Sequence, residues 1–159
     1  MKTANKGEWS EFYVFLKLLG DGQICAADSD LQKIEDLCFP LIKVVRKEND
    51  SVKEFINNSP IIRIIEGESQ NCLLELSAEE FKTKAETLLT EIKKAEKTFS
   101  VPVVEQFMDL INCAKIKADS TDKSDINIVL HDTKTLRDVL FGFSIKSKLG
   151  GSSTLLNAG

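Results

Sequence analysis

Two segments decide the fold: Ser124-Asp125-Ile126-Asn127-Ile128-Val129-Leu130 and, after a polar loop, Gly142-Phe143-Ser144-Ile145-Lys146-Ser147. Both alternate β-branched or aromatic residues with polar ones, which predicts two strands joined as an antiparallel hairpin. Each strand carries a charged residue in an otherwise apolar pattern, Asp125 at the start of the first and Lys146 inside the second. A lysine in a core strand needs a partner, and an aspartate opposite it supplies one. Taken alone, these two residues are as consistent with a buried ion pair that stabilises the hairpin as with a catalytic site.

The position of the loop selects the aspartate that faces the lysine. If the loop is centred between Asp132 and Asp138, paired residue numbers add up to roughly 270, because antiparallel partners match one to one. Asp125 then faces the segment 144–146, whereas Asp132 lies at the turn. Ser144 and Lys146 share one face of their strand because side chains alternate. A loop of even length places Asp125 on that same face.

A second acidic cluster lies on an N-terminal helix that we predict for residues 5–20, with Gly20 as its C-terminal cap. Asn5 and Glu8 have the spacing of a helix-capping pair, so Glu8 has a structural explanation. Glu11 lies beyond the first turn and shares a face with the apolar residues three and four positions later. A carboxylate turned toward a core is costly unless a cation or metal meets it. Glu11 is therefore the better ligand candidate of the two glutamates.

Taken together, these segments resemble the HpaII family of type II restriction endonucleases. The resemblance extends from near the N-terminus to the last residue. Its motifs are Gly7-Glu8-Trp9-Ser10-Glu11, Lys123-Ser124-Asp125-Ile126, Gly142-Phe143-Ser144-Ile145-Lys146-Ser147 and Ser153-Thr154-Leu155-Leu156-Asn157. It implies an α+β fold of the PD-(D/E)XK nuclease type, in which an N-terminal helix packs on a mixed sheet with an antiparallel catalytic hairpin. It also implies cleavage of double-stranded DNA at a short palindrome, which is CCGG for the namesake of the family.

The resemblance implies a magnesium-dependent site. Its catalytic residues would be Asp125, Glu11, Ser144 and Lys146, and its Mg²⁺ ligands Asp125, Glu11 and Glu8. Ser144 stands where the superfamily has a second acid, and a serine is a poor Mg²⁺ ligand beside a carboxylate. Either Glu11 or Glu8 supplies the missing charge from the helix, or the site is weakened. Lys146 would orient or help deprotonate a metal-bound water.

DNA contacts are expected from residues that follow the catalytic lysine, namely Lys148, Ser147 and Ser153. A palindromic target favours a two-fold symmetric homodimer, and the family implies functional pairing with a cognate DNA methyltransferase.

Two other functions remain open. The chain could be a DNA-binding or structural domain that keeps the nuclease fold without cutting, because Ser144 replaces the acid. Glu11 separates this alternative from the enzyme, since a Glu11 that points away from Asp125 favours the non-catalytic domain. The chain could also be a DNA-repair or junction-resolving nuclease of the same superfamily, which differs only in the DNA that it cuts.

The net charge is −4, although DNA binding depends on Lys and Arg contacts to phosphate. A cluster of metal-binding acids lowers the charge locally, and basic residues can still gather on one face. The candidates for such a face are Lys146, Lys148, Lys134 and Arg137.

The four cysteines show no Cys-x-x-Cys spacing, and the chain has a single histidine. This pattern predicts reduced thiols rather than a zinc site or disulfides. Neither an N-terminal apolar signal nor a long apolar span is present in the sequence, which predicts a cytoplasmic protein without a membrane segment. The resemblance implies that this cytoplasm is bacterial.

Residues 23–112 are predicted to form an insertion subdomain within a single nuclease domain over residues 1–159. The pattern predicts strands near 23–27, 39–46, 61–65 and 113–118, a helix at 77–97 and another that starts near Pro102. A dimer surface, a DNA-contacting arm and a packing subdomain all fit the insertion.

The nuclease fold needs a helix and at least one further strand after the lysine strand. We therefore expect an incomplete, N-terminal part of the domain, with an uncovered face or an unpaired edge beside Phe143 and Ile145. Such a chain is expected to bind or cut DNA weakly.

Overall fold

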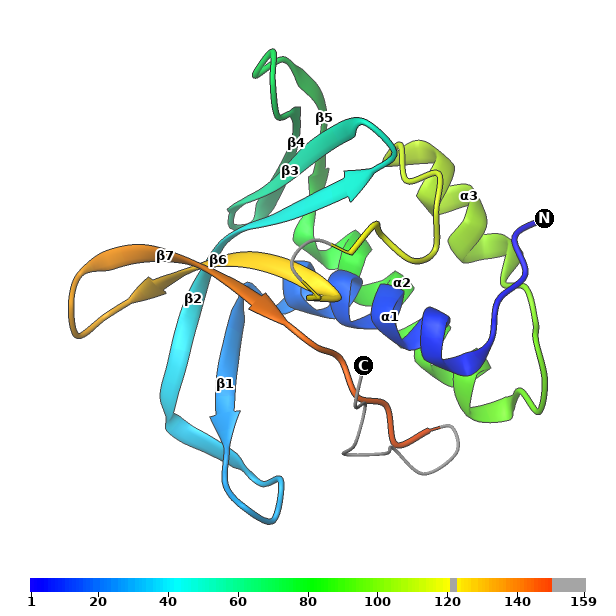
Figure 1. Cartoon of the computed structure of the whole chain (residues 1–159), viewed down its shortest axis with the longest axis horizontal. Coiled ribbons are helices and arrows are strands. Elements are labelled where there is room, and N and C mark those ends of the chain that lie inside the picture. Colours follow the sequence, from blue (N-terminus) through cyan, green and yellow to red (C-terminus); the bar gives the residue numbers. More distant parts are fainter. Residues whose placement is uncertain (121–122, 150–159) are drawn as a thin grey trace.

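The computed structural model describes residues 1–120 and 123–149, which form one curved sheet covered by helices (Figure 1). In chain order the elements are α1 (Lys6–Asp21), β1 (Gln23–Ala27), β2 (Lys33–Glu48), β3 (Ser51–Asn58), β4 (Ile61–Glu66), β5 (Cys72–Ser77), α2 (Ala78–Lys94), α3 (Pro102–Leu110), β6 (Ile126–Asp132) and β7 (Arg137–Phe143). The α+β class predicted from the sequence is confirmed.

The seven-stranded sheet has the order β5-β4-β3-β2-β6-β7, and β1 pairs with the long strand β2 outside this path. The sheet was expected to be mixed, but each described pairing is antiparallel. The segment 23–112, which was expected to form an insertion, supplies β1–β5 of this sheet together with α2 and α3.

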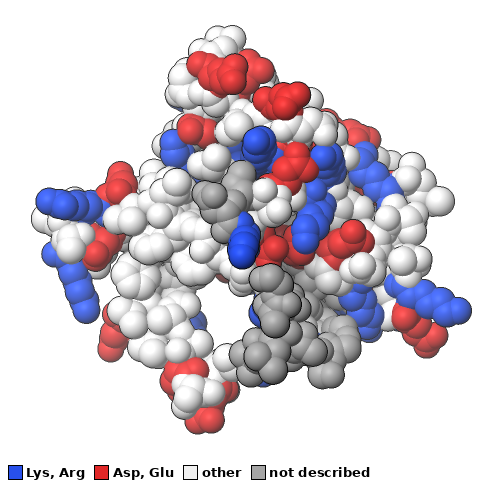
Figure 2. All heavy atoms as spheres, viewed as in Figure 1, with Lys and Arg blue, Asp and Glu red and all other residues white. Residues whose placement is uncertain are grey.

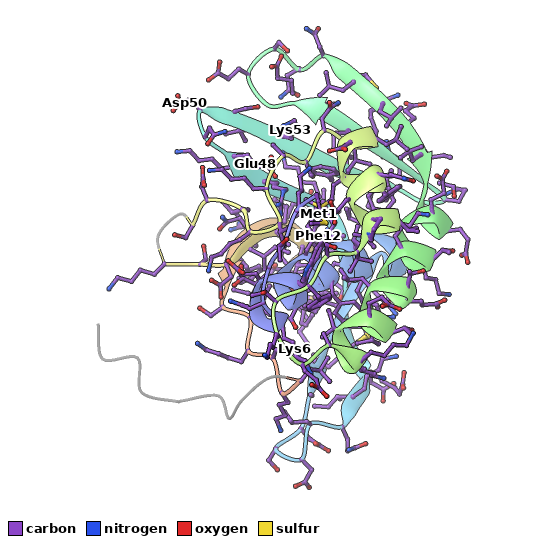
Figure 3. All side chains as sticks on the ribbon, turned by 90° about the vertical axis from the view of Figure 1, so that its right-hand side faces the viewer. Met1, Lys6, Phe12, Glu48, Asp50 and Lys53 are labelled. Carbon is purple, nitrogen blue, oxygen red and sulfur yellow. A yellow bond between two sulfur atoms is a disulfide. The ribbon has the colours of Figure 1, made fainter. Side chains whose placement is uncertain are left out.

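The helix α1 lies between the sheet and α2, as Figure 3 shows. Phe15 of α1 meets Phe55 of β3 edge to face, with ring centroids 4.8 Å apart. On the side of α2 the two helix backbones approach closely at Gly20, where an added Cβ would lie 2.8 Å from the Cα of Lys82. Because α1 is covered on both sides, a polar side chain on it has few directions in which to reach solvent.

The ends of α1 follow from two local motifs. The predicted capping pair is confirmed, since Glu8 N donates to Asn5 Oδ1 and Asn5 N donates to Glu8 Oε2, both at 3.0 Å. The predicted C-terminal cap was wrong: Gly22, not Gly20, takes the left-handed conformation, with a φ of 68°. Gly20 lies within the helix, and the absence of a side chain there allows the backbone of α1 to pack closely against α2.

The hairpin β6–β7 has the predicted register within one residue. Ile126 pairs with Phe143 and Asp132 with Arg137. Asp132 lies at the turn, as expected, where its Oδ1 accepts a hydrogen bond from Lys134 N at 2.9 Å. The second strand was predicted to include residues 144–147, but β7 ends at Phe143.

The strand β7 is at the edge of the sheet, and all of its residues are exposed. Four of its apolar side chains are open to solvent: Val139, Leu140, Phe141 and Phe143. The expected unpaired edge beside Phe143 is thus confirmed within the described part of the chain. Ile145, which was expected on the same edge, packs against the core instead.

The segment 113–118 was predicted to be a strand, but it has no strand structure. Side chains of β2, and not a strand ladder, bind its backbone groups. The strands β3 and β5 were not predicted, because both carry charged residues, which are uncommon in strands. Each of them nevertheless pairs with a strand next to it in the sequence.

Two cysteines correct the expectation of reduced thiols. Cys25 lies opposite Cys38 in the pairing of β1 with β2, and the two form a disulfide. Spacing along the sequence does not show that a hairpin places these thiols face to face. Cys72 is free and exposed, whereas Cys113 is free and buried. Within residues 1–120 and 123–149, no helix combines the length and the apolar character that a membrane span requires.

The two free thiols are expected to differ in reactivity. Burial raises the pKa of Cys113 to about 12, so its thiolate is scarce at neutral pH and its side chain is covered. In the native protein we expect the reagent DTNB to modify Cys72 quickly and Cys113 only after unfolding. A Cys72→Ser variant then shows no fast phase. Two equally fast thiols in the native protein would contradict the buried position of Cys113.

Candidate active site

Two carboxylates from opposite ends of the chain meet across one lysine. Glu11 comes from the middle of α1, and Asp125 directly precedes β6. Lys117 Nζ lies 3.1 Å from Glu11 Oε1 and 3.9 Å from Asp125 Oδ1. Glu11 therefore points toward Asp125, which is the direction that the enzymatic interpretation requires.

Asp125 is held across the start of the segment that follows β7. Its backbone N–H donates to Phe143 O at 2.9 Å, and its Oδ2 accepts a hydrogen bond from Ile145 N at 2.8 Å. The predicted approach of Asp125 to the segment 144–146 is thus confirmed. Oδ1 remains turned toward Lys117.

The Glu11 carboxylate is mostly buried, with 15% of its side chain exposed. Burial raises its pKa, the hydrogen bond and charge of Lys117 act in the opposite direction, and the nearby charges of Asp125 and Glu8 raise it further. Oε2 is buried and has no hydrogen-bond partner among the described residues. A buried carboxylate oxygen without a donor indicates a place where a cation or water is stabilising.

Lys117 was not predicted as a site residue. Its hydrogen bond to Glu11 raises the pKa of its ammonium group, burial lowers it, and the charges of Glu11, Asp125 and Glu8 raise it further. The sequence did carry a signal, because Lys117 directly follows the apolar Ile116, which packs in the core. The argument applied to Lys146, that such a lysine needs an acidic partner, applies equally to Lys117.

A buried ion pair positions the segment that carries Lys117. Arg46 Nε lies 2.7 Å from Glu48 Oε1, and both side chains are almost fully covered. Glu48 Oε2 accepts from Ala114 N at 2.7 Å, and Arg46 donates to Ile116 O at 3.1 Å and to Lys115 O. The backbone just before Lys117 is therefore bound to β2.

The same arginine also contacts α1. Its guanidinium carbon lies 5.3 Å from the ring centroid of Phe12 and 5.1 Å from that of Phe15, within the range of cation–π attraction. Arg46 thus connects β2, the helix that carries Glu11 and the segment that carries Lys117.

A hollow of about 20 Å³ opens between these groups, with Glu11, Arg46, Asp119, Asp125 and Asn127 among its lining residues. It is large enough for about one small ion or water. Figure 2 shows acidic and basic side chains gathered at the centre of this face, whereas the surface over β6 and β7 is largely uncharged.

Comparisons with known proteins identify the family of the chain. The model of the HpaII restriction endonuclease family matches residues 5–159. The chain belongs to the HpaII restriction endonuclease family. It is 40% identical over 160 residues to the type II restriction enzyme HpaII of Haemophilus parainfluenzae. The alignment covers 98% of this chain and 44% of that relative, so the chain spans less than half of the relative's length. No solved structure matches the chain.

The other residues that the resemblance to the HpaII family singled out are exposed, have other partners or lie outside the described residues. Lys146, Ser144 and Lys148 are exposed, and within the described ranges no ion pair involves either lysine. Lys146 therefore does not lie in a core strand as predicted, because the strand ends before it. Ser153 lies outside the described residues.

Two further residues of that set accept hydrogen bonds from other groups. Glu8 Oε2 accepts from the backbone of Asn5 in the helix cap. The hydroxyl of Ser147 accepts from Ser10 Oγ at 3.0 Å and from Leu149 N at 3.2 Å, which binds the segment after β7 to α1.

The carboxylate pair fits a hard divalent cation. Among the described residues, no group of three or more His, Cys, Asp or Glu side chains is arranged to hold a metal. Two carboxylates already share a cationic group, however, and one of their oxygens has no partner. Mg²⁺ commonly uses one or two carboxylates and keeps several waters. Glu11 and Asp125 match that requirement.

Proposed function

We propose that this chain carries the catalytic site of a Mg²⁺-dependent type II restriction endonuclease, which hydrolyses phosphodiester bonds of double-stranded DNA at a short palindrome. The observation that carries the proposal is the meeting of Glu11 and Asp125, from elements far apart in the sequence, beside a hollow of ionic size. Membership of the HpaII family supports the same reaction.

In the proposed mechanism Asp125 and Glu11 are the residues that would hold Mg²⁺ at the site of phosphodiester hydrolysis. When bound, Mg²⁺ supplies positive charge to the transition state and acidifies a coordinated water. Glu11 has to be ionised to bind the metal, and its pKa is raised. As the pH falls, metal binding should therefore begin to weaken at a higher pH than it would with an ordinary carboxyl group. The hydrogen bond from Ile145 N keeps the Asp125 carboxylate in position for metal binding.

Lys146 is the proposed group that orients the attacking water and accepts or donates a proton at Nζ. It follows Ile145, whose backbone N–H donates to Asp125, so the backbone of Lys146 lies next to the proposed site. Ser144, on the other side of Ile145, takes the place of the second acid. DNA contacts are assigned to Lys148, Ser147 and Ser153.

The proposal extends to the assembly and the setting. A CCGG target, a homodimer on that palindrome, a cognate DNA methyltransferase and the bacterial cytoplasm are the substrate, partners and location that follow from a restriction enzyme of this family. The competing proposal, a non-catalytic DNA-binding domain, is less well supported because Glu11 points toward Asp125 and not away from it.

Cleavage of a mixed-sequence DNA substrate with Mg²⁺ tests the proposal. Because general acid–base groups contribute about 100- to 10,000-fold, Lys146→Ala is expected to lose cleavage by about that factor. The control is Lys94→Ala, which removes an exposed lysine in the last turn of α2 and leaves the rate unchanged. Equal cleavage by Lys146→Ala would remove Lys146 from the site. DNA binding without any Mg²⁺-dependent cleavage would favour the non-catalytic domain.

A further inference from the structure

Lys117 is the cationic group bound to both carboxylates of the site. It donates a hydrogen bond to Glu11 Oε1 at 3.1 Å, and its Nζ lies 3.9 Å from Asp125 Oδ1. The two partners are 15% and 21% exposed, whereas Lys117 itself is 46% exposed. One side of the ammonium group therefore faces the carboxylates and the other faces solvent.

We propose that Lys117 is the resident counter-ion of the Glu11–Asp125 pair and that a divalent cation binds there only by displacing its ammonium group. The inference rests on the proposed function, because the same carboxylates are the proposed metal ligands. A divalent cation and an ammonium group cannot share these oxygens, since two positive charges about 4 Å apart repel each other strongly in a partly buried site.

The surroundings allow the side chain to leave while its backbone stays. Ile116 O is bound by Arg46, and Asp119 N donates to Lys47 O at 2.9 Å, so the chain is bound to β2 on both sides of Lys117. A lysine has a flexible four-carbon stem and a strongly hydrated head group. The exposed side of Lys117 gives the head group a route to water. Displacement thus needs a rotation of one side chain and no change of fold.

Manganese binding by the 159-residue chain tests the displacement, with Mn²⁺ as the probe and the free ion followed by electron paramagnetic resonance. Ion pairs of this exposure contribute little, so Lys117→Met is expected to bind Mn²⁺ roughly 2- to 5-fold more tightly, which corresponds to at most about 1 kcal/mol. Asp125→Asn should lose this binding, which assigns the signal to the site.

The matched control is Lys17→Met. Lys17 is 44% exposed and pairs with Asp21 at 2.8 Å, and neither residue lines the hollow between Glu11 and Asp125. Its removal should leave the Mn²⁺ affinity unchanged. An affinity of Lys117→Met equal to or weaker than that of the parent chain, with binding still lost in Asp125→Asn, overturns the displacement and leaves the proposed function standing.

A double-mutant cycle without metal tests the counter-ion role separately. In EDTA, Lys117→Met should lower the urea midpoint, and most of that loss should disappear when Glu11 is already glutamine. Equal losses in both backgrounds overturn the counter-ion role. If neither the parent chain nor any variant binds Mn²⁺, the metal site of the proposed function and the displacement both fail, and the cycle still decides whether Lys117 is a counter-ion.

Discussion

Replacing Asp125 by asparagine is expected to abolish Mg²⁺-dependent cleavage of double-stranded DNA, with a rate loss of about 1,000-fold or more. A metal ion contributes several kcal/mol to the stabilisation of the transition state, and each 1.36 kcal/mol corresponds to a factor of ten in rate. Asparagine keeps the acceptor oxygen for Ile145 N but loses the charge that holds the metal. DNA binding should stay the same or tighten, because one negative charge near phosphate is removed.

The measurement compares cleavage rates in Mg²⁺ with DNA binding in EDTA. Asp132→Asn is the control, since Asp132 lies at the other end of β6 and hydrogen-bonds within the turn. An asparagine there can keep the turn, and cleavage should be unchanged. Undiminished cleavage by Asp125→Asn would place the metal site elsewhere in the molecule.

The second large effect concerns stability. Arg46→Met is expected to lower the free energy of unfolding by about 3–5 kcal/mol, which is the usual cost of removing one partner of a buried ion pair. Arg46 and Glu48 are 6% and 4% exposed, so Glu48 would keep a buried charge without its counter-ion. The variant also loses the hydrogen bonds from Arg46 to the segment before Lys117.

A second arginine–glutamate pair provides the control. Arg63 Nε and Glu75 Oε1 are 2.8 Å apart, almost the distance in the buried pair, but their side chains are 48% and 49% exposed. Arg63→Met should therefore leave the free energy of unfolding almost unchanged. Urea unfolding of both variants gives the comparison. Equal losses would show that burial does not determine the contribution of these pairs.

Local patterns were sufficient to predict the hairpin and one end of α1. Alternating residues and a polar turn determine β6 and β7, and their register places Asp125 opposite the segment after β7. The spacing of Asn5 and Glu8 gives the helix start. Glu11 could be selected because a carboxylate on an apolar helix face needs a cationic partner, and the structure supplies one in Lys117.

The remaining features depend on contacts between distant parts of the chain. Which lysine meets Glu11 is decided by the path of the segment 113–118, and that path is fixed by Arg46 and Glu48 of β2. The opposition of Cys25 and Cys38 depends on the register of a hairpin that the sequence predicts only in part. The end of β7 before Ser144 also follows from tertiary contacts, because Ile145 turns toward the core and Asp125.

The separation of Glu11 and Lys117 by 106 residues also orders events during synthesis of the protein. A ribosome adds about 5–20 residues per second, so roughly 5–20 s pass between the two residues. During that interval the segment that brings Glu11 its cationic partner is still incomplete, and Asp125 has not yet been made. A nascent chain that ends before Lys117 lacks the ammonium group that Glu11 and Asp125 share. A cell that makes this protein therefore carries unfinished chains that cannot yet assemble the site.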